Sequence, residues 1–147
     1  GFGTVEIRVC DNVPTLKEMV QIAALSQCLI VALSEHYDTA TQLPLLDRWI
    51  LAENKWRATR YGLDADIIID DSGNQQTLKE SFNELIDKLI PISKKLGCNK
   101  ELESLVDLVN NNKAPYNRQL DTYKKLNDLN LVIKKSISEL KESLNGY

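Results

Sequence analysis

The stretch TLKESFNELIDKLIPISKKLGCNKELESLVDLV, residues 77–109, predicts two consecutive helices and thereby decides the fold class. In its first half, apolar residues recur every three or four positions, the period of one helix face. These residues are Phe82, Leu85, Ile86, Leu89 and Ile92. Thr77 and Glu80 have the spacing of a capping box at the helix start. Gly97 is suited to end this helix, and Pro91 is expected to kink it.

The same helical period continues to the C-terminus. Asn99 is a residue type that caps helix starts, and we expect it to open the second helix of the stretch. The apolar face of that helix is Leu102, Leu105, Val106 and Val109. Two further helices are predicted over residues 116–126 and 129–144. The last of them carries apolar residues at helical spacing, namely Leu129, Val132, Ile133, Ile137, Leu140 and Leu144.

Two helices are also predicted ahead of the stretch. Thr15–Glu18 repeats the TLKE tetrapeptide, and the helix that it opens should run to about His36. Within it, Ile22–Leu33 is apolar almost all the way round, which predicts a core helix packed on several sides and a candidate interface. The next helix should have Pro44 in its first turn and end at Gly62.

Short strands are predicted besides the helices. From Thr4 to Cys10, apolar and polar residues alternate, which is typical of a strand with one buried face. Ile67–Ile69 is a second short apolar run, followed by an Asp-Ser-Gly-Asn turn. We therefore predict one mainly α unit over residues 1–147, a helical bundle with one or two short strands. Residues 1–12 supply a strand and residues 15–147 the helical portion.

Composition excludes several classes of protein. The chain has 43% hydrophobic and 27% charged residues, as soluble domains do, and its net charge of -3 gives no basic surface for nucleic acid. The apolar run Cys28–Tyr37 is shorter than the roughly 20 residues of a membrane span, so neither a span nor a signal peptide is expected. Three cysteines without a C-x-x-C pattern argue against a disulfide framework and against a zinc site. We therefore expect a cytoplasmic protein.

Glu6 and Arg8 form the first candidate site. At i and i+2 of the predicted strand, their side chains share one face and lie roughly 7 Å apart. A carboxylate there could bind Mg²⁺ or Mn²⁺, and a guanidinium could bind a phosphate or carboxylate. The simpler alternative is a solvent-exposed strand face with cross-strand ion pairs.

The second candidate site is the helix that contains ENKWRATRYGLDA, residues 53–65. Asn54, Arg57 and Arg60 lie in or beside an aromatic face on this helix, where they could line an anion-binding cleft. The simpler alternative is a surface ion pair between Glu53 and Arg57 at i, i+4. The single histidine, His36, supports neither a catalytic triad nor a multi-histidine metal site.

Three segments together resemble a known family. FGTVEIRVCDNVPTL (residues 2–16), ENKWRATRYGLDA (residues 53–65) and LGC (residues 96–98) resemble, in order and spacing, the C-terminal part of the glutamate-cysteine ligase type 2 family. The resemblance extends from Phe2 to about Arg118. The segment around Arg118 departs from the family's later arginine-containing motif, which leaves its role open.

The resemblance implies a catalytic core like that of glutamine synthetase, an α+β ligase that uses ATP and Mg²⁺ or Mn²⁺. The implied reaction phosphorylates a carboxylate, which an amine then attacks. Glu6 is implied as a metal ligand and Arg8 as the catalytic contact to the transferring phosphoryl group. Asn54, Arg57 and Arg60 are implied as substrate-binding residues, or as residues that hold the strand in place.

The resemblance also implies that this chain is a C-terminal fragment of a longer ligase, inactive alone. A start in mid-strand, with glycine rather than methionine, fits that expectation. Expected partners are small molecules, an amino acid and ATP, together with a second copy of the chain if the ligase self-associates. The alternative function is a helical interaction or oligomerisation module without catalysis, with Ile22–Leu33 as its contact surface.

Overall fold

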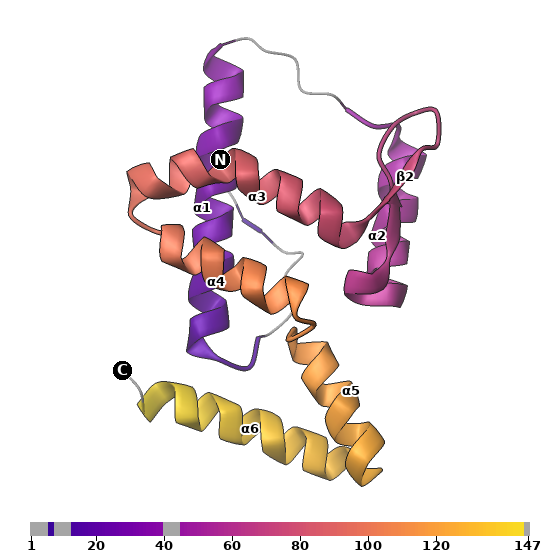
Figure 1. The fold of residues 1–147 in the computed structure, drawn as a ribbon, viewed down its shortest axis with the longest axis vertical. Coiled ribbons are helices and arrows are strands. Elements are labelled where there is room, and N and C mark those ends of the chain that lie inside the picture. Colours follow the sequence, from indigo (N-terminus) through magenta and orange to yellow (C-terminus); the bar gives the residue numbers. More distant parts are fainter. Residues whose placement is uncertain (1–5, 8–12, 40–44, 146–147) are drawn as a thin grey trace.

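The chain folds as a set of six helices and one small hairpin in a computed structural model that describes residues 6–7, 13–39 and 45–145 (Figure 1). Chain order gives α1, α2, a short 3-10 turn, β1, β2 and then α3 to α6. The bounds of these elements are α1 Leu16–Asp38, α2 Arg48–Tyr61, the 3-10 turn Gly62–Asp64, β1 Asp66–Ile68, β2 Gln75–Thr77, α3 Leu78–Leu96, α4 Asn99–Asn110, α5 Pro115–Leu126 and α6 Leu129–Asn145.

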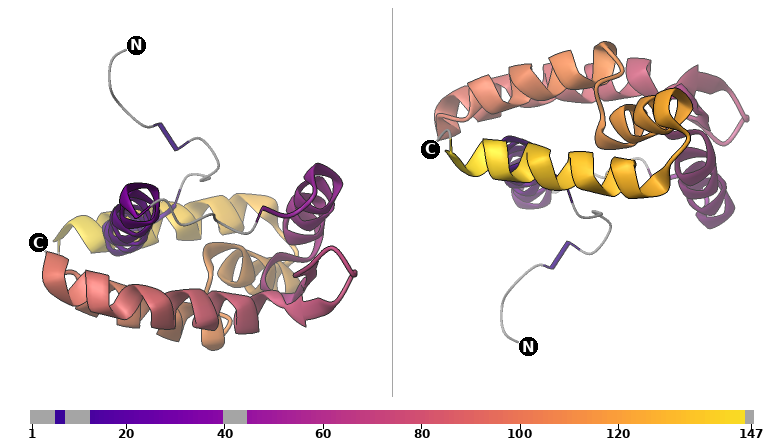
Figure 2. Two further views of the ribbon diagram at one scale, coloured as in Figure 1. Left: turned by 90° about the horizontal axis from the view of Figure 1, so that it is seen from above. Right: turned by 90° about the horizontal axis from the view of Figure 1, so that it is seen from below.

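The core lies where α1 crosses α3 and α4. In Figure 1 the two later helices lie one above the other across α1, and the two panels of Figure 2 show α1 on one side of this pair. Their shared cluster of buried residues is Ala24, Cys28, Ile86, Leu89, Ile92 and Leu102. The two α3 residues Phe82 and Leu85 and the α4 residue Val106 pack around it, half-buried. The predicted apolar faces of α3 and α4 are thus the ones that form the core.

The predicted helix ends are partly correct. Thr77 and Glu80 form a complete capping box at the start of α3, and Gly97 ends it in the left-handed conformation. The expected cap by Asn99 is wrong, because Asn99 is the first residue of α4 and Cys98 occupies the N-cap position without a side-chain hydrogen bond. Helix α2 begins at Arg48, later than predicted, and Pro44 lies outside the described residues.

Strand β1 includes two residues of the predicted apolar run Ile67–Ile69, whereas no pattern in the sequence marked its partner β2. Asp66, Ile67 and Ile68 pair antiparallel with Thr77, Gln76 and Gln75, respectively. The turn between the strands is held by Asp70, whose carboxylate accepts hydrogen bonds from the backbone of Ser72 and Asn74. The predicted strand Thr4–Cys10 lies outside the described residues except for Glu6 and Ile7, both exposed.

Helix α1 is packed on one face rather than on several sides as predicted. Its buried positions are Glu18, Gln21, Ala24 and Cys28. Met19, Val20, Ile30 and Leu33 are exposed. By length and composition, α1 could cross a membrane, contrary to the expectation from the shorter run Cys28–Tyr37, and it is the one described helix that could. The same criterion is met by core helices, and the packed face of α1 has that role here.

Helices α5 and α6 form a helical hairpin below the core in Figure 1, in which α6 runs back at an angle from the end of α5. Helix α6 contacts α1, yet none of its described residues is buried. The apolar residues predicted for this helix are therefore uncovered at several positions. Exposed members are Leu129, Ile133, Ile137, Leu140 and Leu144. This hairpin consequently presents an apolar face that nothing described in this chain covers.

Candidate functional site

Asn54 attaches α2 to the hairpin. Its side-chain amide donates a hydrogen bond of 2.8 Å to the carbonyl of Ile68, and its side-chain oxygen accepts one of 2.8 Å from the N–H of the same residue. Ile68 is buried, and its backbone N–H and carbonyl lie on the edge of β1 that faces away from β2. Asn54 thus satisfies backbone groups that a neighbouring strand would otherwise pair.

Arg57 makes a second attachment one helical turn later. Its Nη1 donates to the backbone oxygen of Asp66 at 3.0 Å and to Oε1 of Gln75 at 2.8 Å, so it contacts both strands. Its Nε pairs with Glu53 at 2.8 Å, which is the i, i+4 pair of the simpler interpretation. The guanidinium that could have received an anion is therefore engaged within the fold.

An open cleft of about 420 Å³ lies between α2 and the hairpin. Its lining is Glu53, Trp56, Arg57, Tyr61, Asp64, Asp66 and Gln75. Three carboxylates face one guanidinium here, and Lys79 lies 3.7 Å from the Asp64 carboxylate as a second cation at the rim. In this form the cleft does not have the positive charge that the anion-binding hypothesis expects.

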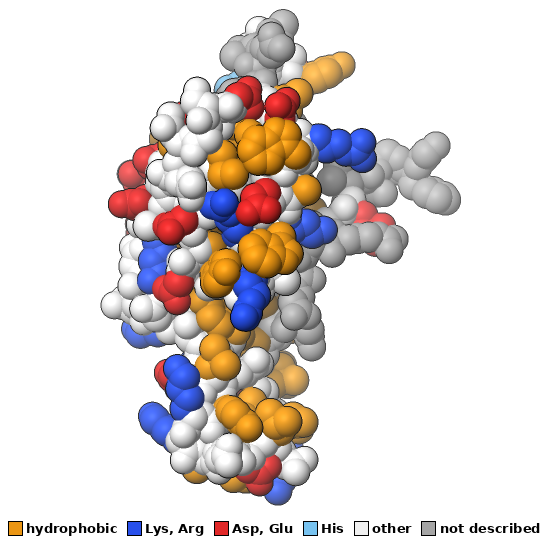
Figure 3. All heavy atoms as spheres, turned by 90° about the vertical axis from the view of Figure 1, so that its right-hand side faces the viewer, with side chains coloured by type: hydrophobic (Ala, Val, Ile, Leu, Met, Phe, Trp, Pro, Cys, Tyr) orange, Lys and Arg blue, Asp and Glu red, His pale blue; other side chains and the backbone are white. Residues whose placement is uncertain are grey.

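Arg60 is the third predicted residue of this helix and points to solvent. Its guanidinium carbon lies 5.8 Å from the centre of the Tyr61 ring, a cation–π contact, and it forms no ion pair with any described residue. Tyr61 also meets Trp56 edge to face, with ring centres 5.9 Å apart. Figure 3 shows this side of the molecule, where exposed apolar side chains alternate with charged ones. Of the three predicted residues, Arg60 is the one that remains available to a ligand.

Gly62 joins α2 to the 3-10 turn under a tyrosine from α5. Its φ of +60° is a conformation that favours glycine, and a Cβ at this position would lie 2.6 Å from the Tyr116 ring. The Tyr116 hydroxyl accepts a hydrogen bond of 2.9 Å from the N–H of Leu63. The sequence predicted Gly62 as a helix end, but not that it makes room for Tyr116.

Arg118 belongs to a three-helix ionic cluster away from this cleft. Its Nη1 lies 2.7 Å from Glu18 of α1, and its Nη2 lies 3.1 Å from Glu139 of α6. Burial alone would lower the pKa of Arg118, but its hydrogen bonds to both carboxylates raise it above the ordinary value. The residue whose role the sequence left open therefore connects α5 to the first and last helices.

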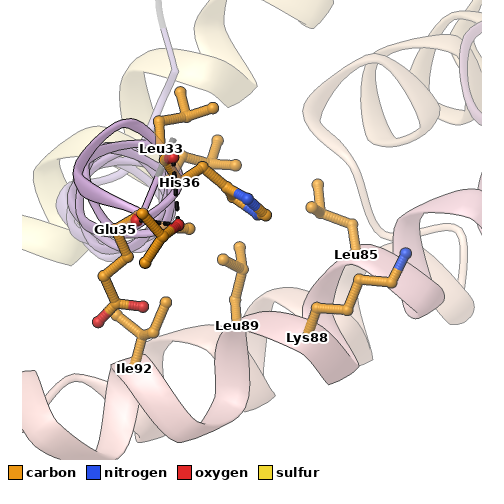
Figure 4. A pocket seen from close by; sticks show the side chains of 10 residues that line it. Leu33, Glu35, His36, Leu85, Lys88, Leu89 and Ile92 are labelled. Atoms are coloured by element: carbon orange, nitrogen blue, oxygen red, sulfur yellow. Dashed lines mark hydrogen bonds between the residues drawn. The ribbon is translucent and has the colours of Figure 1, made fainter. Parts of the chain in front are cut away.

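A further cavity of about 530 Å³ separates the end of α1 from α3 (Figure 4). Its floor is apolar, with Leu85 and Leu89 pointing into it from α3, and the His36 ring points into it from α1. Glu35 and Lys88 lie at its rim. No polar set converges on one point here, so the cavity has the character of uncovered core surface rather than of a catalytic centre.

The first candidate pair is only half described. Glu6 is exposed, and Arg8 lies outside the described residues, so their predicted spacing remains a prediction. Within the described residues, no three His, Cys, Asp or Glu side chains come together in a way that could hold a metal ion. The described residues by themselves therefore do not fit a complete Mg²⁺ or Mn²⁺ site.

Sequence reasoning missed residues that fix the site, two of which, Asp66 and Gln75, also line it. Gln75, Asp66 and Tyr116 act through contacts between elements distant in sequence, and no local motif marks such contacts. The one available signal was Asn54 itself, since an asparagine within a helix is disfavoured unless its amide has a partner.

Comparisons with known proteins agree with the resemblance. Residues 1–142 match the model of the family described as Glutamate-cysteine ligase family 2 (GCS2). A protein of Frankia casuarinae and one of Mycolicibacterium vanbaalenii, both named "Putative glutamate--cysteine ligase 2-1", are each 40% identical to this chain over 140 residues. These matches cover 95% of this chain but only 36% and 37% of the two relatives. The chain thus spans about a third of the length of the relatives that it matches.

Proposed function

This chain belongs to the glutamate-cysteine ligase family 2, and from that membership we propose that it forms the C-terminal part of an ATP-dependent carboxylate-amine ligase. The match over residues 1–142 carries the proposal, because it includes both the predicted strand with Glu6 and Arg8 and the helix with Asn54 and Arg57. The short share of the relatives' length supports the view that further strands of the ligase lie outside this chain.

The proposed reaction has two chemical steps. A carboxylate oxygen attacks the terminal phosphorus of ATP, which gives an acyl phosphate and releases ADP. The nitrogen of an amine then attacks the acyl carbon, loses a proton and expels inorganic phosphate as the amide forms. We propose glutamate and cysteine as the two substrates, which the names of the relatives suggest.

Glu6 and Arg8 are proposed as one wall of the active site. A guanidinium at Arg8 would stabilise the negative charge on the transferring phosphoryl group, which is the main requirement of such a transfer. Glu6 would be one carboxylate at this wall. The described residues lack the other donors that a divalent metal needs, so we assign the metal no step of the reaction.

Helix α2 is proposed to support that wall and to contribute Arg60. The hydrogen bonds of Asn54 and Arg57 to the hairpin fix α2 against β1 and favour a positioning role for these two residues. Arg60, with its guanidinium in solvent, is the substrate-binding candidate of this helix. We propose a cytoplasmic enzyme, since ATP and thiols are available there.

The alternative function, an interaction module, finds support in the uncovered apolar surfaces. Exposed apolar residues lie on α1, namely Val20 and Leu33, and on α6, namely Leu129. The exposed fraction is 50% for Leu33 and 66% for Leu129. Surfaces of this kind mark contacts with another protein or domain. We assign them to the remainder of the ligase, so that both functions apply to one protein; self-association is the competing use.

The test is ADP release by the ligase that contains this chain. We expect ADP formation that depends on glutamate and rises when cysteine is added, whereas the isolated chain should release none. Glutamate-dependent ADP release by the isolated chain would overturn the assignment as an incomplete part. Absence of any carboxylate-dependent ADP release by the longer protein would overturn the ligase assignment.

A further inference from the structure

Two cysteines distant in sequence meet in the core. The Sγ atoms of Cys28 and Cys98 lie 3.7 Å apart, although 70 residues separate them. Cys28 is fully buried on the packed face of α1, and Cys98 is half-buried at the N-cap of α4. Both are free thiols. Nothing in the proposed ligase reaction uses either of them.

The two sulfur atoms must still move closer together before a disulfide can form. A disulfide needs the two sulfurs at roughly 2.05 Å, so the pair would have to close by roughly 1.6 Å. Cys98 is in the connection between α3 and α4, directly after Gly97 in the left-handed conformation. The N–H of Cys98 donates to the carbonyl of Ser93 at 2.9 Å, so rotation of the thiol side chains, rather than a shift of the helix boundary, has to supply this approach.

We propose that Cys28 and Cys98 form a reversible oxidation site that takes low-molecular-weight disulfides as its oxidant. The Cys98 thiolate attacks one sulfur of the disulfide, forms a mixed disulfide and releases one thiolate. Cys28 then loses its proton and attacks the Cys98 sulfur, which releases the second small thiol. Two protein thiols are oxidised by two electrons, and one small disulfide is reduced to two thiols.

The order of the two attacks follows from the environment of each thiol. Burial raises the pKa of Cys28 to about 11, and its contact with Cys98 adds to this, so Cys28 remains protonated in the resting protein. The partly accessible Cys98 is therefore the residue that meets the oxidant. Cys28 reacts second, once its sulfur neighbour has become the electrophile.

The bond would join the first helix to the middle of the core. Cys28 belongs to the buried cluster shared by α1, α3 and α4, and Cys98 packs against that cluster. A covalent link at this point restricts separation of α1 from the other two helices. Since α1 follows the segment that contains Glu6 and Arg8 in sequence, oxidation would restrain the helix to which that segment is joined. This proposal does not depend on the ligase assignment.

The test exposes the folded chain to glutathione disulfide, blocks the remaining thiols with iodoacetamide and maps the digest by mass spectrometry. The expected product links Cys28 to Cys98 and is removed by dithiothreitol. The same treatment in urea is the reference, because unfolded chains should also give links that contain Cys10. A folded protein in which Cys28 and Cys98 are both alkylated would overturn the proposal. The same mixture of links as in urea would also overturn it.

Variants separate the two steps. Cys28→Ser should stop the reaction at the glutathione adduct of Cys98, and Cys98→Ser should leave Cys28 unmodified. Cys10→Ser is the matched control and should still form the link at the wild-type rate. A wild-type protein that retains glutathione on Cys98, without a link to Cys28, would also contradict the proposal.

Discussion

Asn54 pairs with both backbone groups of Ile68, at 2.8 Å each, as a strand neighbour would. The hairpin that these bonds hold has only three residues in each strand, too few for independent stability. Helix α2 therefore holds the hairpin that forms the other side of the cleft. Two polar residues of this helix, Asn54 and Arg57, hold the hairpin in place.

Removal of the Asn54 amide should loosen the hairpin. Asn54→Ala leaves the N–H and the carbonyl of the buried Ile68 without partners, at a cost of about 2 kcal/mol in the free energy of unfolding. Urea unfolding followed by circular dichroism measures this cost. The control is Asn130→Ala on α6, which is exposed and has no side-chain hydrogen bond to another described residue. It should change the stability by less than about 0.5 kcal/mol. Equal effects of the two variants would contradict the role of Asn54.

Gly62→Ala should be more harmful than Gly97→Ala. Both glycines have positive φ, but only at Gly62 would the new Cβ meet the Tyr116 ring, at 2.6 Å, while nothing lies within 4 Å at Gly97. The conformational cost is about 1 kcal/mol at either position, so the excess at Gly62, which we expect to reach about 1 kcal/mol or more, reports the tyrosine contact. Thermal unfolding of both variants measures it, and an equal loss would show that the ring moves away freely.

Arg118→Ala should destabilise the chain much more than loss of an exposed ion pair. Glu18 would remain buried without its partner, at a cost of about 3 kcal/mol. Lys113→Ala is the control, because its pair with Asp107 is exposed and worth at most about 1 kcal/mol. Denaturant unfolding compares the two. Similar values would mean that Glu18 recovers solvent or another partner when Arg118 is removed.

The capping box of α3 predicts a pH dependence. The hydrogen bonds from Thr77 lower the pKa of Glu80 below its ordinary value of 4.5. The unfolded chain therefore binds a proton that the folded chain does not, and the stabilising contribution is present above pH 4.5 and lost as the pH falls through the lower folded value. Glu80→Gln should flatten this part of the curve of stability against pH. An unchanged slope between roughly pH 5 and 3 would contradict the assignment to Glu80.

The helices could be predicted from the sequence because local signals determine them. The apolar faces of α3 and α4, the TLKE caps and Gly97 all depend on residues within one or two turns of each other. The same locality explains the error at Asn99: an asparagine after Gly97 has the right type, but the chain turns one residue earlier and leaves Cys98 at the cap.

The contacts between elements could not be predicted. Gln75 pairs with Arg57 and Glu18 with Arg118 across long separations in sequence, and polar residues of these types have no periodic pattern to reveal a partner. The segment Ile22–Leu33 is apolar on nearly all sides, which predicts packing on several sides. In the described residues only one face of α1 is covered.

The role of the predicted active-site wall is the central claim, and turnover of ATP tests it most directly. In the ligase that contains this chain, Glu6→Ala and Arg8→Ala should each lower glutamate-dependent ADP release by about 100-fold or more, as loss of a charge-stabilising group does. Glu84→Ala and Arg48→Ala, exposed on α3 and α2, are the matched controls and should retain the wild-type rate. Wild-type turnover by the Glu6 and Arg8 variants would contradict the account.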